Sequence, residues 1–183
     1  MALAPVPDAG PVRDIELTRM RRRHLRRVLA IESQVYPRPW SPSLFLSELA
    51  QRSTRSYLVA KHAGEVIGYA GMMFMVDEAH VTNIAVDPVF HGRRVGTRLL
   101  LTLITESIAR GTRVISLEVR TSNSPAQEMY AKFGFSTVGV RRGYYIETDE
   151  DALVMTVEDA LSTSYRNRLA AIRTSLDAPG APG

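Results

Sequence analysis

With 183 residues, the chain is long enough to bury a sizeable core in one domain and short for two independent domains. Its residues, 45% hydrophobic and 23% charged, include no apolar run near the ~18 residues of a membrane span, and the lack of cysteine excludes disulfides, thiolate metal sites and a cysteine nucleophile. The net charge of +4 and the isoelectric point near 9.7 favour an anionic ligand or partner, without distinguishing a phosphate-rich cofactor from a polynucleotide.

The N-terminal part begins with a leader over 1–13 that mixes alanine with proline and glycine. Because it lacks the basic start and apolar block of a secretory signal, we expect a disordered leader on a cytoplasmic protein. Ile15 and Leu17 predict a short strand, with Thr18 as the N-cap of an arginine-rich helix. The six arginines in 19–27 are interpreted as the solvated face of that helix, and a phosphate-binding surface is the alternative.

Proline marks the next boundaries. Pro37 and Pro39 end this helix and stiffen the loop from Tyr36 to Trp40, and Ser41-Pro42 begins a second helix with serine as its N-cap. The further predicted elements are strands at 57–61, 66–75 and 80–86, a helix at 97–110, a strand at 113–120, a helix that runs to 133 with Ser124 as its N-cap, strands at 135–141 and 152–157 separated by Arg142 to Tyr145, and a helix at 161–176.

The order of these elements indicates the fold class. An antiparallel meander followed by a strand, helix, strand unit is typical of a mixed sheet rather than a doubly wound one. We therefore predict an α+β fold with a mixed, mostly antiparallel central sheet flanked by helices, and an additional C-terminal helix. The main domain is expected to span 14–158, with the C-terminal helix and a Pro/Gly tail over 159–183.

A candidate anion-binding loop follows the strand at 80–86. The loop from Val89 to Gly96 leads directly into a helix near Thr97, and a helix start presents unpaired N–H groups and the positive end of the helix dipole. Gly92 and Gly96 would let a phosphate approach the backbone, and Arg93 and Arg94 add charge. Taken alone, the pattern fits a structural turn equally well.

Longer motifs resemble a known family. His91-Gly92-Arg93-Arg94-Val95-Gly96 resembles the acetyl-CoA signature of the GNAT superfamily of N-acetyltransferases, in which Gln or Arg, two variable residues, Gly, one variable residue and Gly or Ala follow one another; His91 and Arg94 depart from it. The runs that resemble the RimI-type ribosomal-protein-alanine branch are Leu117-Glu118-Val119-Arg120, Ser122-Asn123, Met129 to Phe135 and Arg141 to Tyr145. The resemblance covers roughly 17–157 and implies the GNAT fold.

The resemblance also implies roles for particular residues. The family's general base falls on Glu118, which strand alternation places away from the core, and its general acid falls on Tyr130. Acetyl-CoA is the expected acetyl donor, with no metal. The expected cofactor contacts are Ile84, Ala85 and Val86 through the strand backbone, Gly92, Arg93, Arg94, Val95, Gly96 and Thr97 at the loop and helix start, and Asn123. The expected acceptor groove contains Tyr36, Trp40 and Tyr144, which fit packing aromatics equally well.

The pKa of the acceptor amine indicates which kind of amine the expected reaction uses. An amine must be neutral to attack a thioester, and an α-amino group with a pKa near ~8 loses its proton more easily than a lysine near ~10.4. We expect direct acetyl transfer to a protein or peptide N-terminal α-amino group, such as the alanine terminus of a ribosomal protein. The alternatives are a small-amine or lysine acetyltransferase of the same fold, and a non-catalytic RNA- or ribosome-binding module, against which Glu118 and Tyr130 argue. Neither a membrane nor nucleic acid is an expected partner.

Overall fold

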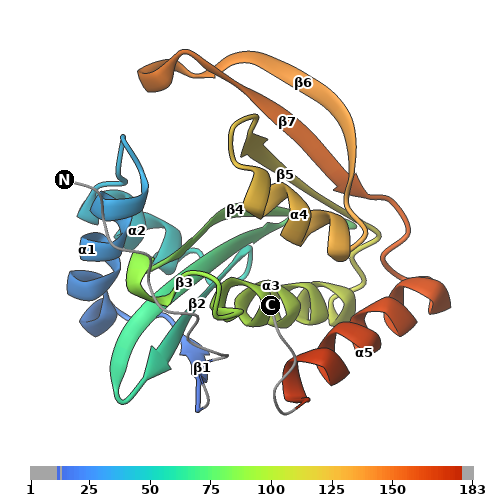
Figure 1. The fold of residues 1–183 in the computed structure, drawn as a ribbon, viewed down its shortest axis with the longest axis horizontal. Helices are drawn as coiled ribbons and strands as arrows, with labels where there is room; N and C mark the ends of the chain where they lie inside the picture. Colours follow the sequence, from blue (N-terminus) through green and yellow to red (C-terminus); the bar gives the residue numbers. More distant parts are fainter. Residues whose placement is uncertain (1–11, 13, 179–183) are drawn as a thin grey trace.

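A central sheet of seven strands organises the part of the chain that the structure, a computed structural model, describes: residue 12 and residues 14–178 (Figure 1). The strand order is β1-β2-β3-β4-β5-β7-β6, and β4–β5 is the one parallel pair among these strands. The strands are β1 (Glu16–Arg19), β2 (Arg55–His62), β3 (Glu65–Phe74), β4 (Glu78–Val86), β5 (Val114–Arg120), β6 (Ser136–Tyr145) and β7 (Glu150–Val157). The predicted α+β class with a mixed, mostly antiparallel sheet is confirmed.

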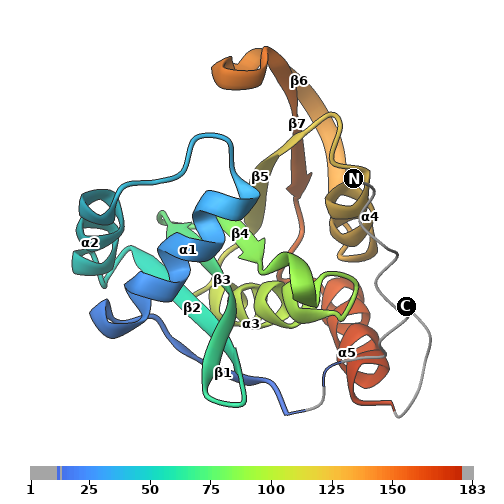
Figure 2. The same ribbon diagram turned by 60° about the vertical axis from the view of Figure 1, so that its left-hand side comes forward.

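Helices cover both faces of the sheet (Figure 2). Within the described residues the α-helices are α1 (Leu25–Val35), α2 (Pro42–Ala50), α3 (Val95–Ala109), α4 (Ser124–Lys132) and α5 (Thr163–Asp177). Alternation along β2 explains the two layers, because Leu58 and Ala60 pack into the core cluster that contains α3, whereas Tyr57 and Val59 pack into the one that contains α1 and α2. The sheet therefore buries apolar side chains on both faces.

The arginine-rich segment differs from its prediction. Thr18 lies within β1 rather than capping a helix, and a short 3-10 turn over Arg22–His24 precedes α1. Arg19 pairs with Glu106 of α3 at 3.0 Å, and Arg27 pairs with Asp87 beyond the end of β4. The six arginines therefore do not share one helix face, although all of them except Arg27 are exposed as expected. The two at the ends of the segment link the helices to the sheet.

Two further boundaries differ from the prediction. The N-cap of α4 is Asn123, whose side-chain oxygen accepts the Ala126 N–H at 3.2 Å, so Ser124 is the first helical residue and not the cap. Tyr144 and Tyr145 belong to β6, which spans ten residues, although its pairing with β7 is interrupted between Arg141 and Tyr145, where the sequence predicted the strand to end. The β6–β7 hairpin thereby becomes long enough to project beyond the body of the sheet (Figure 1).

The C-terminal helix is present as predicted. Ser162 caps α5 by accepting the Tyr165 N–H at 3.0 Å, and Tyr165, Leu169 and Leu176 are buried in the same core cluster as α3. Across the described residues, no helix is long and apolar enough to cross a membrane. Of the predicted leader only Val12 lies within the described part of the chain, and the division at 158 and 159 stays a prediction.

Candidate active site

A gap opens in the sheet between β4 and β5. The parallel pairing of these strands covers three register pairs and ends with His80 opposite Ser116, after which the strands diverge. Beyond His80, the backbone groups of β4 on this side have no neighbouring strand to pair with. A gap in the centre of a sheet leaves hydrogen-bonding groups available to an extended ligand.

The hydrogen bonds of β4 show which of its groups face the gap. The Ile84 carbonyl accepts from the Tyr36 hydroxyl at 2.7 Å, and the Val86 carbonyl lies 2.8 Å from His91 Nε2. In a strand the N–H and C=O of one residue point to the same side, so the amides of Ile84 and Val86 face the gap as well. The backbone of Ala85, between them, faces β3.

The loop after β4 is anchored at its start. Asp87 is 5% exposed and pairs with Arg27 from α1, and its other carboxylate oxygen accepts the Val89 N–H at 3.0 Å. These bonds fix the chain where it leaves the sheet. The loop that follows therefore begins from a rigid support.

The start of α3 is built for an anion. Arg94 is the N-cap with φ 62° and ψ 16°, a left-handed conformation, and its own side chain makes no capping bond to the helix. Gly92 also has a positive φ of 72°. The arginine thus adopts the conformation that the family signature supplies with glycine, at a cost of about 1 kcal/mol. The first N–H groups of α3, from Val95 to Thr97, have no partner within the helix and could therefore bind an anionic ligand.

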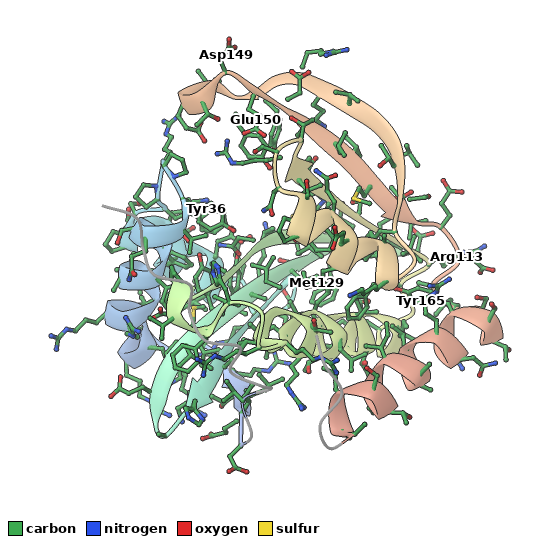
Figure 3. The ribbon with its side chains drawn as sticks, in the orientation of Figure 1. Tyr36, Arg113, Met129, Asp149, Glu150 and Tyr165 are labelled. Atoms are coloured by element: carbon green, nitrogen blue, oxygen red, sulfur yellow. The ribbon has the colours of Figure 1, made fainter. Side chains whose placement is uncertain are left out.

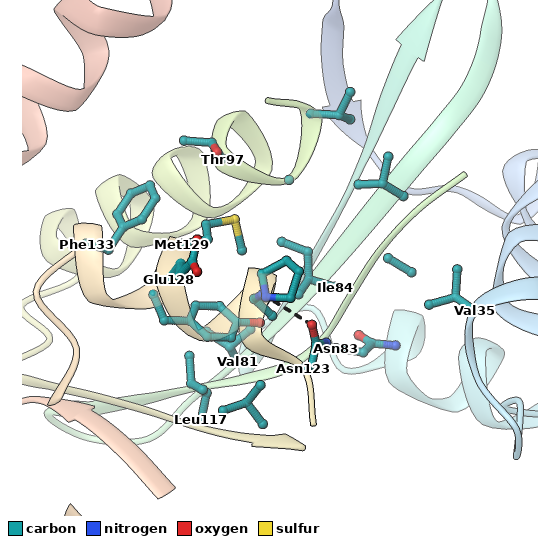
Figure 4. Close-up of a pocket in the computed structure, with 18 of the residues that line it drawn as sticks. Val35, Val81, Asn83, Ile84, Thr97, Leu117, Asn123, Glu128, Met129 and Phe133 are labelled. Atoms are coloured by element: carbon teal, nitrogen blue, oxygen red, sulfur yellow. Dashed lines mark hydrogen bonds between the residues drawn. The ribbon is translucent and has the colours of Figure 1, made fainter. Parts of the chain in front are cut away.

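A cleft of about 1090 Å³ joins the gap and this loop (Figure 4). A pocket for one drug-sized ligand has about 300–1,000 Å³, so the cleft has room for a long ligand and part of a second. The predicted site residues that line it are Tyr36, Trp40, Ile84, Ala85, Val86, Gly92, Arg94, Val95, Gly96, Thr97, Glu118, Asn123, Tyr130 and Tyr144. Arg93 lies outside this lining, and its guanidinium stacks on Phe90 with 5.5 Å to the ring centroid.

The residues of the cleft fit coenzyme A. The Asn83 side-chain nitrogen is buried and has no hydrogen-bond partner within the described residues, which suits an amide carbonyl of the pantetheine arm. Near the α3 start, a Cβ added to Gly96 would lie 3.5 Å from the Met129 sulfur, which is an ordinary contact distance. Among the described residues, no group of three or more His, Cys, Asp or Glu side chains could hold a metal ion.

Glu118 lies on β5 in the wall of the cleft. Its carboxylate is 9% exposed, with Oε2 2.9 Å from His80 Nε2 and Oε1 3.2 Å from an Arg141 nitrogen. The hydrogen bond from His80 lowers the pKa of Glu118 against the effect of burial, and Arg141 lowers this pKa further. The carboxylate is therefore ionised at neutral pH and can accept a proton.

Tyr130 enters the cleft from α4. It is 5% exposed, and its ring meets Phe135 edge-on with 5.8 Å between centroids. Burial raises the pKa of Tyr130 well above 10, with a smaller contribution from Tyr145. The hydroxyl thus keeps its proton at neutral pH, which is the state that a proton donor requires.

Aromatic residues line the end of the cleft that lies away from the start of α3. Tyr36, at the end of α1, and Met129, on α4, lie on opposite sides of it (Figure 3). Trp40 packs on Phe45 with 5.3 Å between centroids, and Tyr144 packs edge-on against Tyr145. Trp40 and Tyr144 thus pack against neighbouring rings, and the role of these residues in binding the acceptor stays a prediction.

Sequence reasoning missed two ionisable residues of the cleft, His80 and Glu32. His80 holds Glu118, and its Nδ1 lies 2.9 Å from the Ser116 hydroxyl. Glu32 is 1% exposed, and one of its oxygens accepts the Trp40 N–H at 2.9 Å. Alternation did place Ser116 and Glu118 on one face of β5, but only the β4–β5 register brings His80 to them.

The site is extended, runs along a divided sheet and ends at the start of a helix that can hold phosphates. This arrangement is that of an acyltransferase that uses acyl-CoA. Residues 25–135 match the model of the Acetyltransferase (GNAT) family, and the chain belongs to this family. It is an N-acetyltransferase, and its acetyl donor is acetyl-CoA.

Individual relatives agree with this assignment. The chain is 38% identical over 154 residues to a Mycobacterium tuberculosis protein named N-alpha-acetyltransferase RimI, covering 81% of this chain and 93% of that protein. It is 37% identical over 129 residues to the [ribosomal protein bS18]-alanine N-acetyltransferase of Escherichia coli K12, covering 69% and 86%. The crystal structure of the Escherichia coli ribosomal-protein-S18-alanine N-acetyltransferase superposes with a TM-score of 0.74 at 30% identity, over 81% of this chain and 96% of that one.

Proposed function

We propose that this enzyme acetylates the N-terminal α-amino group of a protein in the cytoplasm, and that its acceptor is the alanine terminus of a ribosomal protein. The names of the two relatives above, which are more than 35% identical to this chain, support the proposal that the acceptor is such an α-amino group. The observation that carries the proposal is the ionised Glu118 in the wall of a cleft whose far end is aromatic.

The proposed reaction needs one proton acceptor and one proton donor. Acetyl-CoA, when bound, supplies the acetyl group as a thioester. Glu118 accepts the proton of the acceptor amine, directly or through water, as the amine attacks. Tyr130 donates its proton to the departing thiolate, and burial keeps that proton in place until then.

The backbone of β4 supports the same reaction. The amides of Ile84 and Val86 face the gap and can donate hydrogen bonds to the thioester oxygen as negative charge develops there. The anion-binding start of α3 fixes the other end of the donor. The roles of Gly92, Arg94, Gly96 and Asn123 in binding remain part of the proposal.

A panel of acceptors tests the proposed function. The purified enzyme is incubated with acetyl-CoA and an alanine-starting peptide of a ribosomal protein, the same peptide with a blocked N-terminus and an internal lysine, and a polyamine. We expect acetyl transfer to the alanine peptide and at least 100-fold slower transfer to the others, because the lysine amine holds its proton more tightly. Transfer to the polyamine alone would overturn the proposal.

The RNA-binding alternative is tested with the Glu118→Gln variant. We expect this variant to lose transfer to the alanine peptide. Unchanged transfer, together with RNA binding that weakens steeply with salt, would instead favour the nucleic-acid module.

A further inference from the structure

The C-terminal helix α5 lines the same cleft as the cofactor loop. Its contributions to the lining are Arg168, Ala171, Ile172, Ser175 and Leu176. The family model ends at residue 135, so the family motifs assign no role to this helix. In Figure 1 and Figure 2, α5 lies beside α3, on the side of the sheet away from α1 and α2.

Two arginines attach the end of α5 to the start of α3. Arg94 donates to the Ser175 carbonyl at 2.8 Å, and Arg98 donates to the Leu176 carbonyl at 2.8 Å. The last carbonyls of a helix carry the negative end of its dipole and are favourable partners for arginine. The residue that replaces the signature glycine is therefore also the residue that fixes α5 against the cofactor loop.

The opposite part of α5 presents a cation to the cleft. The Arg168 guanidinium donates to the Lys132 carbonyl at the end of α4, at 3.2 Å, and its remaining N–H groups have no hydrogen-bond acceptor among the described residues. Both Arg168 and Lys132 line the cleft, beside the buried Phe133 and the half-buried Ile172. Two cations next to an apolar surface match a nucleotide, whose base packs on apolar groups and whose phosphate pairs with cations.

The order of parts in coenzyme A fixes which part reaches this wall. The pantetheine arm fits the gap between β4 and β5, and the diphosphate fits the start of α3. The adenosine 3′-phosphate must then extend past the first turn of α3, where the cleft is bounded by α4 and α5. We propose that α5 forms the outer wall of the nucleotide end of the acetyl-CoA site, with Arg168 and Lys132 binding the ribose 3′-phosphate and Ile172 packing on the adenosine.

This inference rests on the use of acetyl-CoA that the proposed function requires. Its test compares coenzyme A with 3′-dephospho-coenzyme A, which lacks only the 3′-phosphate, by isothermal titration calorimetry. We expect Arg168→Gln to bind coenzyme A roughly 10-fold more weakly than the wild type and to bind the dephospho form with unchanged affinity. Lys132→Gln, at the exposed end of α4, should show the same selective loss.

Arg166→Gln is the matched control, because Arg166 is an exposed arginine of α5 that does not line the cleft. It should leave both affinities unchanged. In the wild type, hydrogen exchange of the α5 amides should slow when coenzyme A is added. If both cleft variants bind coenzyme A as tightly as the wild type, the inference is overturned. It is also overturned if the variants lose as much affinity for the dephospho form as for coenzyme A. A wild type that binds neither ligand would instead overturn the proposed function.

Discussion

Glu118 and His80 are bonded to each other across the two strands that part to form the cleft, with 2.9 Å between Oε2 and Nε2. The last register pair of β4 and β5 sets this contact, because it places His80 beside Ser116, two residues before Glu118. The carboxylate is thus held at the point where the strands begin to diverge. One bond fixes the orientation of the proposed base and lowers its pKa.

Replacing Glu118 by glutamine should remove the proton acceptor while keeping the shape of the side chain. We expect kcat for an alanine peptide to fall about 10²- to 10⁴-fold, the usual contribution of a general base. Affinity for coenzyme A, measured by calorimetry, should change little, since the cofactor loop is untouched. Glu158→Gln, at an exposed position after β7, is the control and should keep wild-type kcat. Equal rates for the two variants would rule out Glu118 as the base.

Replacing His80 by leucine should change the pH dependence of the reaction. Since the hydrogen bond from His80 is the largest cause of the lowered pKa of Glu118, its loss should raise this pKa and move the acid limb of kcat/KM to higher pH. His80→Gln keeps a donor and should restore part of the shift. A pH profile of His80→Leu that coincides with that of the wild type would show that His80 does not set the ionisation of the base.

Replacing Tyr130 by phenylalanine removes one hydroxyl and keeps the ring against Phe135. We expect kcat to fall about 10²-fold with little change in melting temperature, because the loss is that of a proton donor and not of packing. Tyr165→Phe is a close match, since Tyr165 is also buried and its hydroxyl has no partner within the described residues. That variant should keep full activity, and a similar loss in both would assign Tyr130 to the core alone.

Local patterns were sufficient for most of the fold. The alternation along β2 and β5 and the serine and proline at Ser41-Pro42 are properties of a few adjacent residues, and the structure has these elements close to where the sequence predicts them. The motif order around Glu118 and Tyr130 led to the family for the same reason. The pairing of Arg27 with Asp87 could not be predicted from local patterns, because the two residues lie 60 positions apart and meet only in the folded protein.

The role of Arg94 needed the structure as well. From sequence, an arginine in place of a glycine indicates only a departure from the signature. The side chain in fact bonds to a helix 81 residues further along the chain, while its backbone keeps the left-handed conformation of a glycine. A stabilising contact and a strained backbone thus meet at one residue.

These two effects can be separated with two substitutions. Arg94→Gly and Arg94→Ala both lose the bonds to Ser175, but only alanine keeps the cost of a side chain at φ 62°. We expect Arg94→Gly to be more stable than Arg94→Ala by about 1 kcal/mol in urea unfolding. Equal stabilities would mean that the loop relaxes out of the left-handed region once the arginine is removed.

Glu32 should make stability depend on pH between about 4.5 and 7. Burial raises the pKa of Glu32 from 4.5 to about 7, although the Trp40 N–H opposes this. In that window the folded state keeps a proton that the unfolded state releases. The contribution of Glu32 to the free energy of unfolding therefore falls as pH rises, and this contribution becomes constant above pH 7. Glu32→Gln stays neutral and can still accept the Trp40 N–H. It should therefore gain on the order of 2 kcal/mol over the wild type between pH 5 and pH 8 in urea unfolding. Glu158→Gln should show no such gain, and a constant difference between Glu32→Gln and wild type at all pH values would contradict a raised pKa.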